Sequence, residues 1–570
     1  MEAKSLGQML GLRCARFAGK TAMLAPGQGG FRPISYKELY ATVQMYAGAI
    51  DSLGLKKGDR LCILSENCPE WAFADWACQT LGIVVVPIYP TLPADQAQYI
   101  VKDSGALVLL AGDANQAKKV EGVANLKVML LKGADSLDEL ARSRKHMIAA
   151  DAWEKRIAEI EPEDIATVIY TSGTTGLPKG AMLNHRGFLS VFHSILHSIP
   201  MSDSDMFLSF LPMSHVYERT DGQYLPIYLG ATIAYAKNLA SLANDIVQAK
   251  PTVMLVVPRF LEATADKILD GMKKQKPLNQ KLFHWALQQG TKHFNGEFAP
   301  FYWLTEKLVG KKVRERFGGR LRFFVSGGAA LPRHVAEFYG AFGIQILQGY
   351  GLTETYSGVC VNHPDRNRPD TVGEVLDSVE VKIADDGEIL FRGDARMVGY
   401  YNLPKETAEA IDRDGWFHTG DIGMFDGQYL KITDRKKDLL VLGNGKNVAP
   451  QPIENKLRSS HYIQEAVVLG DGMDSCVALI VPNFEALRAE IPDFKRMGDD
   501  EISRDDEVRK KIRQEIDKVN KTLAGFEMVK KYAILERAFS IESGEMTPSF
   551  KVKRNVVKER YSKEIADMKK

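Results

Sequence analysis

The sequence lacks the patterns that mark several common classes of protein. Its six cysteines include no Cys-x-x-Cys pair, so neither a zinc site of that kind nor a disulfide framework is indicated. Lys and Arg number 74 against 72 Asp and Glu, whereas a nucleic-acid-binding protein normally has a marked basic excess. We therefore expect reduced structural thiols and no nucleic acid partner.

Long hydrophobic runs are also missing. The longest uncharged stretches, near residues 187–201 and 222–236, are interrupted by His, Ser or Pro and fall short of the roughly 20 apolar residues that span a bilayer. Residues 1–24 contain scattered Lys and Arg, which leave no continuous apolar core for a signal peptide. We expect a cytoplasmic protein, and any contact with the inner face of the membrane should be peripheral.

A chain of 570 residues is too long for one hydrophobic core and predicts at least two domains. As far as residue 347, short apolar runs alternate with helical stretches, which is typical of a mostly parallel sheet covered by helices. From Val379 onward, alternating strands and Asp-Gly turns predict antiparallel hairpins. The predicted fold class is α/β: residues 1–433 form a large domain of parallel or mixed sheets plus a small antiparallel β region, and residues 434–570 form a smaller α+β domain.

Two helices are predicted with defined ends. Ser35 is a plausible N-cap for a helix that continues to Leu53. A second helix places Val508 and, further along the same face, Leu523 toward a core, and we expect Gly525 to stop it.

The stretch from Ile165 to Leu183 organises the functional interpretation. It begins as an apolar strand and enters a glycine-rich loop that ends in Lys179. Glycines allow backbone N–H groups to approach an anion closely, and the loop adds hydroxyl donors and a positive charge, a combination that suits a polyphosphate. The hydroxyl residues are Thr171, Ser172, Thr174 and Thr175, with Gly173 between them. The Walker A spacing is absent, which excludes a P-loop NTPase, but such a loop taken alone is more often a solvated turn.

Eleven consecutive residues, Tyr170 to Gly180, resemble the signature of the adenylate-forming superfamily, which includes acyl-CoA synthetases, luciferases and the adenylation domains of peptide synthetases. Further motifs of that superfamily follow in order. Leu211 to Arg219 resembles a stretch of long-chain acyl-CoA synthetases that lines the acyl site, which implies acyl contacts for His215, Val216 and Tyr217. In some members a tryptophan gates the fatty-acid tunnel. Its position would fall near Arg219, so the resemblance does not imply that gate in this chain.

Two glycine-containing motifs resemble the superfamily's nucleotide site. Small residues after the strand at Val325 would let a flat ring approach the backbone, and the resemblance places adenine beside Gly327, Gly328 and Ala329. The second motif resembles Tyr-Gly-x-Thr-Glu and comprises Gln348, Gly349, Tyr350, Gly351, Thr353 and Glu354. There Tyr350 would face adenine, Thr353 would bind the α-phosphate, and Glu354, with Thr171, would be a hard oxygen ligand for Mg²⁺.

The last motifs surround the predicted domain boundary at 434–435. Asp421 matches an aspartate that accepts hydrogen bonds from both ribose hydroxyls, a task for which a carboxylate has two acceptor oxygens. Asp434 resembles the residue at which the superfamily's small domain rotates, and Arg435 would contact ribose or phosphate, although a charged run is more often a solvated turn. A following loop with Gly443, Gly445 and Lys446 resembles the one that lines the pantetheine tunnel.

Residues 547–554 resemble the C-terminal motif that supplies the superfamily's catalytic lysine. Lys551 aligns with that lysine because the pattern places an arginine three positions later, where Arg554 stands. Lys553 would be the catalytic lysine if the motif were aligned two residues later, and a basic tail without a catalytic role is the remaining interpretation.

The resemblance covers essentially the whole chain and is closest to bacterial-type long-chain fatty acyl-CoA synthetases. It implies ATP-dependent formation of an acyl-adenylate and then of a thioester with coenzyme A, with Mg²⁺ as cofactor, ATP and CoA as co-substrates, and a mobile C-terminal domain. An acyl-AMP ligase that serves a carrier protein, and an acyl or nucleotide sensor, are the alternatives. The sequence leaves open the acyl chain length and the choice between monomer and homodimer.

Overall fold

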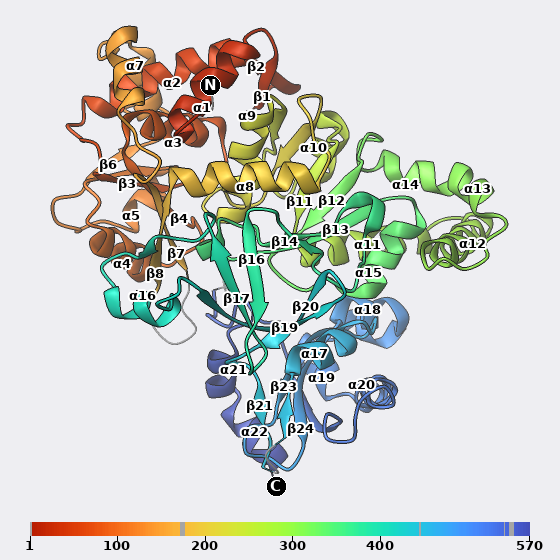
Figure 1. The fold of residues 1–570 in the computed structure, drawn as a ribbon. Coiled ribbons are helices and arrows are strands. Elements are labelled where there is room, and N and C mark those ends of the chain that lie inside the picture. The colour runs from red at the N-terminus through yellow and green to blue at the C-terminus, as the bar shows by residue number, and fades with distance from the viewer. Residues whose placement is uncertain (1–2, 172–176, 444–445, 541, 547–551, 570) are drawn as a thin grey trace. The chain divides into compact units, whose positions relative to one another are not determined.

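The computed structural model describes residues 3–171, 177–443, 446–540, 542–546 and 552–569. The chain divides into two compact units (Figure 1). Unit 1 comprises Met1–Lys382, Leu390–His418 and Gly427–Leu430, and unit 2 comprises Ile383–Ile389, Thr419–Asp426 and Lys431–Lys570.

Unit 1 contains a seven-stranded sheet in the order β18-β8-β7-β4-β3-β5-β6. Its strands are β3 (Arg60–Leu64), β4 (Val84–Ile88), β5 (Val108–Ala111), β6 (Lys127–Leu130), β7 (Ile165–Thr171), β8 (Lys179–Asn184) and β18 (Gly399–Tyr400). Pairing is parallel from β6 to β7 and antiparallel at β8 and β18. Helix α4 (Ala94–Ser104) packs Ile100 and Val101 against this sheet.

Nine strands of a second, larger sheet also belong to unit 1, in the order β15-β14-β13-β12-β11-β9-β10-β1-β2. They are β1 (Thr21–Gly27), β2 (Gly30–Ser35), β9 (Met206–Ser209), β10 (Thr232–Tyr235), β11 (Val253–Val256), β12 (Phe323–Ser326), β13 (Gln345–Tyr350), β14 (Cys360–Val361) and β15 (Glu374–Val375). Neighbours from β13 to β1 are parallel, and β2, β14 and β15 are antiparallel. The predicted parallel or mixed sheets are therefore confirmed.

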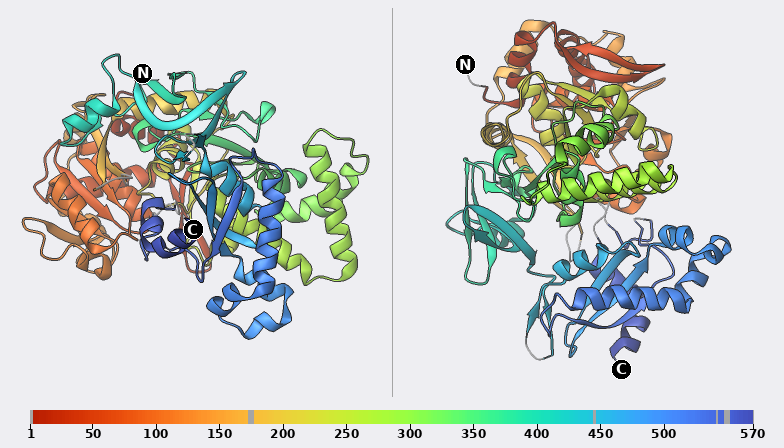
Figure 2. Two further views of the ribbon diagram at one scale, coloured as in Figure 1. Left: turned by 90° about the horizontal axis from the view of Figure 1, so that it is seen from below. Right: turned by 90° about the vertical axis from the view of Figure 1, so that its right-hand side faces the viewer.

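The helices of unit 1 surround these sheets (Figure 2). Besides α4, those before residue 230 are α1 (Leu6–Arg16), α2 (Tyr36–Asp51), α3 (Pro69–Leu81), α5 (Ala114–Lys118), α6 (Leu137–Arg142), α7 (Ala150–Ala158), α8 (His185–Ser198), the π-helix η1 (Glu218–Tyr224) and α9 (Leu225–Leu229). Those after it are α10 (Leu242–Ala249), α11 (Pro258–Lys273), α12 (Pro277–Phe294), α13 (Tyr302–Thr305), η2 (Glu306–Gly310), α14 (Lys311–Glu315), α15 (Arg333–Ala341), η3 (Thr353–Thr355), η4 (Pro364–Arg366) and α16 (Pro404–Ala410).

The predicted N-cap of α2 is confirmed by a reciprocal pair of hydrogen bonds. The Glu38 N–H donates to the Ser35 hydroxyl at 3.2 Å, and the Ser35 N–H donates to the Glu38 carboxylate at 2.7 Å. This capping box satisfies two backbone donors that the first turn of a helix would otherwise leave unpaired.

Four strands are each divided between the two units: β16 (Val379–Ile383), β17 (Glu388–Gly393), β19 (Phe417–Asp426) and β20 (Tyr429–Arg435). The turn between β16 and β17 is closed by the Ala384 N–H, which donates to the Glu388 carbonyl at 2.8 Å. This turn falls at the Asp-Gly sequence that predicted it.

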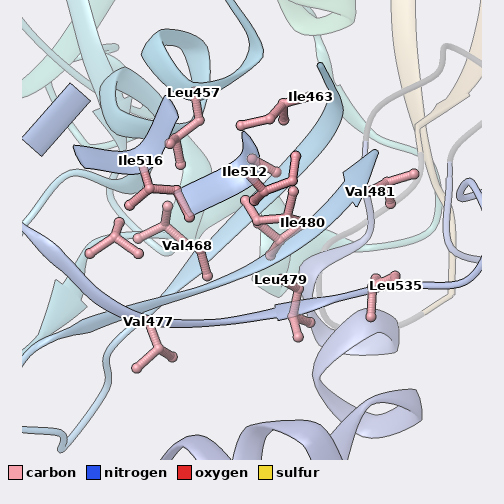
Figure 3. Close-up of a cluster of buried hydrophobic side chains, with 14 of the residues drawn as sticks. Leu457, Ile463, Val468, Val477, Leu479, Ile480, Val481, Ile512, Ile516 and Leu535 are labelled. Atoms are coloured by element: carbon pink, nitrogen blue, oxygen red, sulfur yellow. The ribbon is translucent and has the colours of Figure 1, made fainter. Parts of the chain in front are cut away.

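Unit 2 is an α+β structure, as predicted. Its three-stranded sheet is formed by β23 (Ile463–Leu469), β24 (Cys476–Pro482) and β25 (Val529–Ile534). Figure 3 shows the core, in which Ile512 and Ile516 lie beside apolar side chains of β23 and β24. The other elements are β21 (Leu440–Val441), β22 (Asn447–Val448), α17 (Pro450–Arg458), α18 (Phe484–Glu490), η5 (Pro492–Arg496), α19 (Asp499–Arg504), α20 (Asp506–Asn520), α21 (Arg554–Arg560) and α22 (Ser562–Lys569).

The predicted end of α20 is wrong by several residues, because the helix stops at Asn520 and not near Gly525. The Asn520 side chain binds both the N–H and the carbonyl of Val529, each at 2.9 Å, which ties the end of the helix to the first residue of β25. Leu523 still packs against the core, although it lies outside the helix.

A buried ion pair joins α3 to the π-helix η1. Arg219 and Asp75 are 0% and 2% exposed, and the Arg219 guanidinium donates to both oxygens of the Asp75 carboxylate. It also donates to the hydroxyl of Thr167 on β7 at 2.6 Å, and the Tyr224 hydroxyl donates to Asp75 at 2.6 Å. Every charged group of the pair is thus hydrogen-bonded, as a buried charge requires.

We predict that Asp75→Asn will lower the free energy of unfolding by about 3 to 5 kcal/mol, because it leaves the Arg219 charge buried and uncompensated. Urea denaturation measures the effect. The matched control is Asp51→Asn, which breaks the exposed pair between Asp51 and Arg156 and should cost at most about 1 kcal/mol. Similar small losses in both variants would contradict the role assigned to the buried pair.

Candidate active site

Three residues that are far apart in the sequence meet at one place in unit 1. The Tyr400 hydroxyl donates to Glu354 Oε1 at 2.8 Å, and Lys179 Nζ lies 5.2 Å from the centre of the Tyr400 ring. Burial, and after it the Glu354 charge, raise the pKa of Tyr400 well above its ordinary value, so the phenol remains a donor. Tyr400 therefore connects the predicted metal ligand to the predicted phosphate-binding lysine.

Backbone pairing fixes this arrangement. Tyr400 of β18 lies opposite Ala181 of β8, and the Tyr401 N–H donates to the Gly180 carbonyl at 2.7 Å. The Met397 N–H donates to the Glu354 carbonyl at 2.8 Å. The segment from Met397 to Tyr401 therefore bridges the strand that follows the loop and the turn that carries Glu354.

The predicted phosphate loop begins and ends as an antiparallel pair. Thr171, the last residue of β7, lies opposite Lys179, the first residue of β8, and its hydroxyl donates to the Lys179 carbonyl at 3.4 Å. The chain thus leaves and re-enters the sheet at one point, close to Tyr400. The predicted residues Ser172, Gly173, Thr174 and Thr175 lie outside the described residues.

The turn that carries Thr353 and Glu354 is tightly constrained. A Cβ on Gly351 would lie 1.9 Å from the Ser357 carbonyl oxygen, so only glycine fits there. Tyr356 and Ser357 have φ values of 56° and 85°, in the left-handed region that non-glycine residues rarely adopt. Such backbone strain is typical of functional sites when the surrounding structure stabilises it.

Neighbouring side chains hold this strained segment. The Tyr356 ring packs so closely on α8 that a Cβ on Gly187 would lie 2.1 Å from it, and its hydroxyl accepts the Asn184 N–H at 2.8 Å. The Ser357 hydroxyl donates to the buried Asp221 at 2.9 Å, and burial raises the pKa of Asp221 to about 8. The π-helix η1 therefore contacts the segment that follows Glu354.

The predicted acyl and adenine motifs also meet. The Tyr217 hydroxyl donates to the Val325 carbonyl at 2.8 Å, and the ring lies 3.3 Å from the position that a Cβ on Gly327 would take. Val216 is buried, and Gly328 has a φ of +82° just before Ala329. The ring centres of His215 and Tyr89 are 6.2 Å apart. Tyr217, from the predicted acyl motif, thus contacts the predicted adenine motif.

The motif that contains Gln348 ends β13. The Gln348 side chain accepts the Leu331 N–H at 3.1 Å and donates to the Thr371 carbonyl at 3.3 Å. Gly349 lies opposite Val361 on β14, and Tyr350 is buried. In this structure Gln348 therefore organises backbone around the motif.

Asp421 and Arg435 lie together in unit 2. Arg435 Nε is 3.0 Å from Asp421 Oδ1, and the Asp421 side chain is only 5% exposed. The Asp421 N–H donates to the Thr419 hydroxyl at 3.1 Å. The pair presents a carboxylate beside a guanidinium, which suits a ligand with both hydroxyl and phosphate groups.

Asp434 is buried at the end of β20. Its carboxylate accepts the backbone N–H of Arg435 at 2.6 Å and that of Gln451 at 3.2 Å. Burial raises the pKa of Asp434 to about 6 in spite of these hydrogen bonds. The carboxylate therefore fixes the local backbone in the observed conformation.

The remaining predicted residues of unit 2 are placed only in part. The Gly443 N–H donates to the Met473 carbonyl at 2.8 Å, and Lys446 Nζ lies 4.6 Å from the centre of the Phe526 ring. Gly445 and Lys551 lie outside the described residues. The Lys553 N–H donates to the Glu545 carbonyl at 2.7 Å, immediately before α21.

The donor set is compatible with Mg²⁺ only if a nucleotide contributes ligands. No group of three or more His, Cys, Asp or Glu side chains in the described part of the chain could hold a metal ion. Mg²⁺ in nucleotide sites is commonly bound through one or two protein oxygens, phosphate oxygens and water. Glu354 and Thr171 supply oxygen donors of that kind.

Comparisons with known proteins identify relatives across nearly the whole chain. A family model described as AMP-binding enzyme matches residues 12–401, and one described as AMP-binding enzyme C-terminal domain matches residues 437–570. Fatty acyl-CoA synthetase A of Dictyostelium discoideum is 33% identical over 590 residues, which cover 96% of this chain and 87% of that protein. Long-chain-fatty-acid–CoA ligase FadD15 of Mycobacterium bovis is 33% identical over 560 residues, which cover 94% of this chain and 92% of that protein.

Solved structures show the same fold. The anthranilate CoA ligase AuaEII, crystallised in complex with anthranoyl-AMP, superposes with a TM-score of 0.76 at 19% sequence identity and covers 99% of each chain. At that identity the likeness establishes architecture alone. The resemblance inferred from the motifs is confirmed by the family models and the relatives together.

Proposed function

Because the chain belongs to the AMP-binding enzyme family, we propose that it is a long-chain fatty acid:CoA ligase that forms AMP. The supporting observation is that relatives at 33% identity over 94–96% of the chain are named as fatty acyl-CoA synthetases or ligases. In unit 1 the proximity of Glu354, Tyr400 and Lys179 supports the proposal, because these residues would offer a metal ligand and a cation to a nucleoside triphosphate.

The reaction has two steps that balance without a covalent protein intermediate. The fatty carboxylate attacks the α-phosphorus of ATP and expels pyrophosphate, which gives an acyl-adenylate. The CoA thiol, having lost its proton, then attacks the acyl carbon and AMP leaves. Activation is required because a carboxylate is resonance-stabilised and its oxygen is a poor leaving group. The protein contributes positioning and charge stabilisation to both steps.

Unit 1 would bind the triphosphate. Lys179 and the hydroxyl residues from Thr171 to Thr175 would bind the β- and γ-phosphates, and Thr353 would bind the α-phosphate. Glu354 and Thr171 would hold Mg²⁺, which neutralises phosphate charge when it is bound. Tyr400 would orient the Glu354 carboxylate by donating to one of its oxygens. No sequence motif indicates this role for Tyr400.

Adenine would lie beside Gly327, Gly328 and Ala329, with Tyr350 and the Gln348–Gly351 backbone nearby. The acyl chain would enter on the other side of Tyr217, which contacts Gly327. His215 and Val216 would contribute to that acyl side. A single aromatic ring would thus separate the nucleotide from the fatty acid and set the position of the reacting carboxylate.

Unit 2 would supply different groups to each step. Asp421, before the proposed hinge in the sequence, and Arg435, directly after it, would bind the ribose and a phosphate. Lys551 would offset the repulsion between the carboxylate and the α-phosphate during adenylation, whereas Gly443, Gly445 and Lys446 would line the CoA path during thioester formation. We propose that rotation at Asp434, between a domain of residues 1–433 and one of residues 434–570, exchanges the two sets.

One experiment can identify both the acceptor of the acyl group and the preferred carboxylate substrate. A panel of carboxylates of increasing chain length is assayed for acyl-CoA formation with ATP, Mg²⁺ and CoA, and for pyrophosphate release without CoA. Acyl-CoA formation that is greatest for long chains supports the proposal. Pyrophosphate release without acyl-CoA would favour an acyl-AMP ligase that serves a carrier protein, and neither product would favour a sensor.

We predict that Glu354→Ala will slow adenylation by about 10² to 10³-fold at ordinary Mg²⁺ concentration, because it removes a charged ligand from the triphosphate site. ATP–pyrophosphate exchange measures the rate. Glu409→Ala, an exposed glutamate on α16, is the matched control and should exchange at the wild-type rate. Wild-type activity of Glu354→Ala at saturating Mg²⁺, with unchanged thermal stability, would remove Glu354 from the site.

Asp434→Pro should separate the two half-reactions. Proline fixes φ near about −65° and removes a backbone donor, so it should block the rotation while leaving adenylation in place. We expect pyrophosphate exchange to persist and acyl-CoA formation to fall. Asp434→Ala removes the same carboxylate without fixing φ and should retain acyl-CoA formation; equal loss of both activities in Asp434→Pro would contradict the hinge.

Lys551→Ala should affect only the first step. The loss of one cation that bridges two anions in a partly dehydrated site costs roughly 3 to 4 kcal/mol, or about 10² to 10³ in the adenylation rate. Supplied with preformed acyl-adenylate, the variant should transfer the acyl group to CoA at nearly the wild-type rate. Lys553→Ala is the matched control. If Lys553→Ala alone loses adenylation, the catalytic register is two residues later, and if neither variant does, the tail is only a basic surface.

A further inference from the structure

Residues 271–320 form a strongly basic segment at one side of unit 1. They contain eleven Lys or Arg and three Glu, a net charge of +8, in a chain whose total net charge is only +2. The segment comprises the last three residues of α11 and then α12, α13, η2 and α14 with their connections, and is called the basic projection below. Figures 1 and 2 show its helices at the edge of unit 1, away from the seven-stranded sheet.

Large aromatic side chains are exposed at one end of the basic projection. Phe298 is 86% exposed, Trp303 67% and Phe301 51%. Across the described residues, the only other aromatic ring among the strongly exposed hydrophobic side chains is that of Phe425, at 36%. Three of four such rings therefore lie within six consecutive residues. Exposed apolar groups that gather in this way usually mark an interaction surface.

The aromatic end is held in place by contacts within the projection. The ring of Phe301 lies 5.8 Å from that of Trp285 on α12, and the ring of Tyr302 stacks on His293 at 3.9 Å. These contacts fix the connection between α12 and α13. The side chains of Phe298 and Trp303 are consequently presented to solvent from a structured support.

Positive charge and a further apolar side chain lie directly beyond the aromatic end. Lys307, Lys311 and Lys312 are exposed on the continuous helical stretch made by α13, η2 and α14, and Leu308 among them is 41% exposed. Arg314 differs, because it is engaged with Glu306 and with the Phe342 carbonyl. The lysines therefore provide the outward-facing charge.

We propose that the basic projection docks the protein on an anionic lipid surface, with Phe298, Phe301 and Trp303 inserted at the level of the headgroups. Aromatic rings favour the membrane interface, and each nearby Lys or Arg adds attraction to acidic lipids. Leu308 beside the lysines fits an acyl boundary better than a nucleic acid, which offers bases and phosphates but no hydrocarbon. The surface is distinct from the site residues, so this proposal does not depend on the reaction proposed above.

The test is sedimentation with vesicles of phosphatidylcholine alone and with a quarter of the lipid replaced by phosphatidylglycerol. The full-length protein should bind the mixed vesicles, bind the neutral ones much less, and lose binding as salt rises. The double variant Phe298→Ser, Trp303→Ser and the double variant Lys311→Gln, Lys312→Gln should each reduce the partition coefficient by about tenfold or more. Their melting temperatures should equal that of the wild type, because all four positions are exposed.

Matched controls come from the same unit. Leu239→Ser alters a side chain that is 71% exposed elsewhere, and the double variant Lys118→Gln, Lys127→Gln removes the same charge from another surface; both should bind as the wild type does. Equal binding to neutral and anionic vesicles, or unchanged binding by both projection variants, would overturn the proposal. So would projection variants that lose self-association or RNA binding while vesicle binding is unchanged, since the surface would then serve another partner.

Discussion

The ion pair between Arg219 and Asp75 is the constraint on which much of unit 1 depends. Removing two charges from water costs several kcal/mol per ion, and this cost is offset only where geometry and hydrogen bonding are complete. Here the pair also engages Thr167 of β7 and Tyr224 of η1. One set of bonds therefore connects a helix, the seven-stranded sheet and the π-helix, and none of the three can shift without exposing a charge to an apolar interior.

The ion pair between Arg219 and Asp75 also bears on two parts of the candidate site in unit 1, the strand that leads into the phosphate loop and the segment that follows Glu354. β7 carries Thr167 in its interior and Thr171 at its end, so the strand that the pair holds is also the one that leads into the phosphate loop. η1 carries Asp221, which accepts the hydroxyl of Ser357 in the strained segment behind Glu354. A π-helix is an uncommon element that frequently occurs at functional sites. The left-handed residues cost about 1 to 3 kcal/mol each, and the packing of Tyr356 on α8 helps to offset this.

The sequence alone predicts the features whose residues are contiguous in the chain. The alternation of strands and helices, the capping box at Ser35 and the motif that ends in Glu354 each occupy a short window with a local physical reason. Tyr400 could not be found in this way, because it lies in a two-residue strand with no periodicity, 46 residues after its partner Glu354. Nothing local in the sequence links Arg219 to Asp75, which lies 144 residues earlier in a mostly apolar helix.

Errors in the predicted ends of helices and strands also arise from contacts between residues that are far apart in the sequence. Gly525 is a reasonable stop for a helix, but Asn520 ends α20 earlier because its side chain pairs with the backbone of Val529, a contact that depends on where β25 lies. Division of β16, β17, β19 and β20 between the two units is likewise a tertiary property. Period-two patterns predict the strands, but they do not reveal which compact unit each half of a strand joins.

Asp434 shows what a hinge at this position would have to overcome. Its carboxylate accepts two backbone N–H groups, from Arg435 and Gln451, and a change of its dihedrals would have to release or replace both. A typical hydrogen bond contributes about 0.5 to 1.5 kcal/mol, and one to a charged group about 1.5 to 3 kcal/mol. Burial opposes the charged form and raises the pKa to about 6, so the observed conformation holds an ionised group less favourably than water would. The two effects act in opposite directions: the hydrogen bonds hold the observed dihedrals, and burial of the charge weakens that hold, which lowers the cost that the proposed rotation would have to meet.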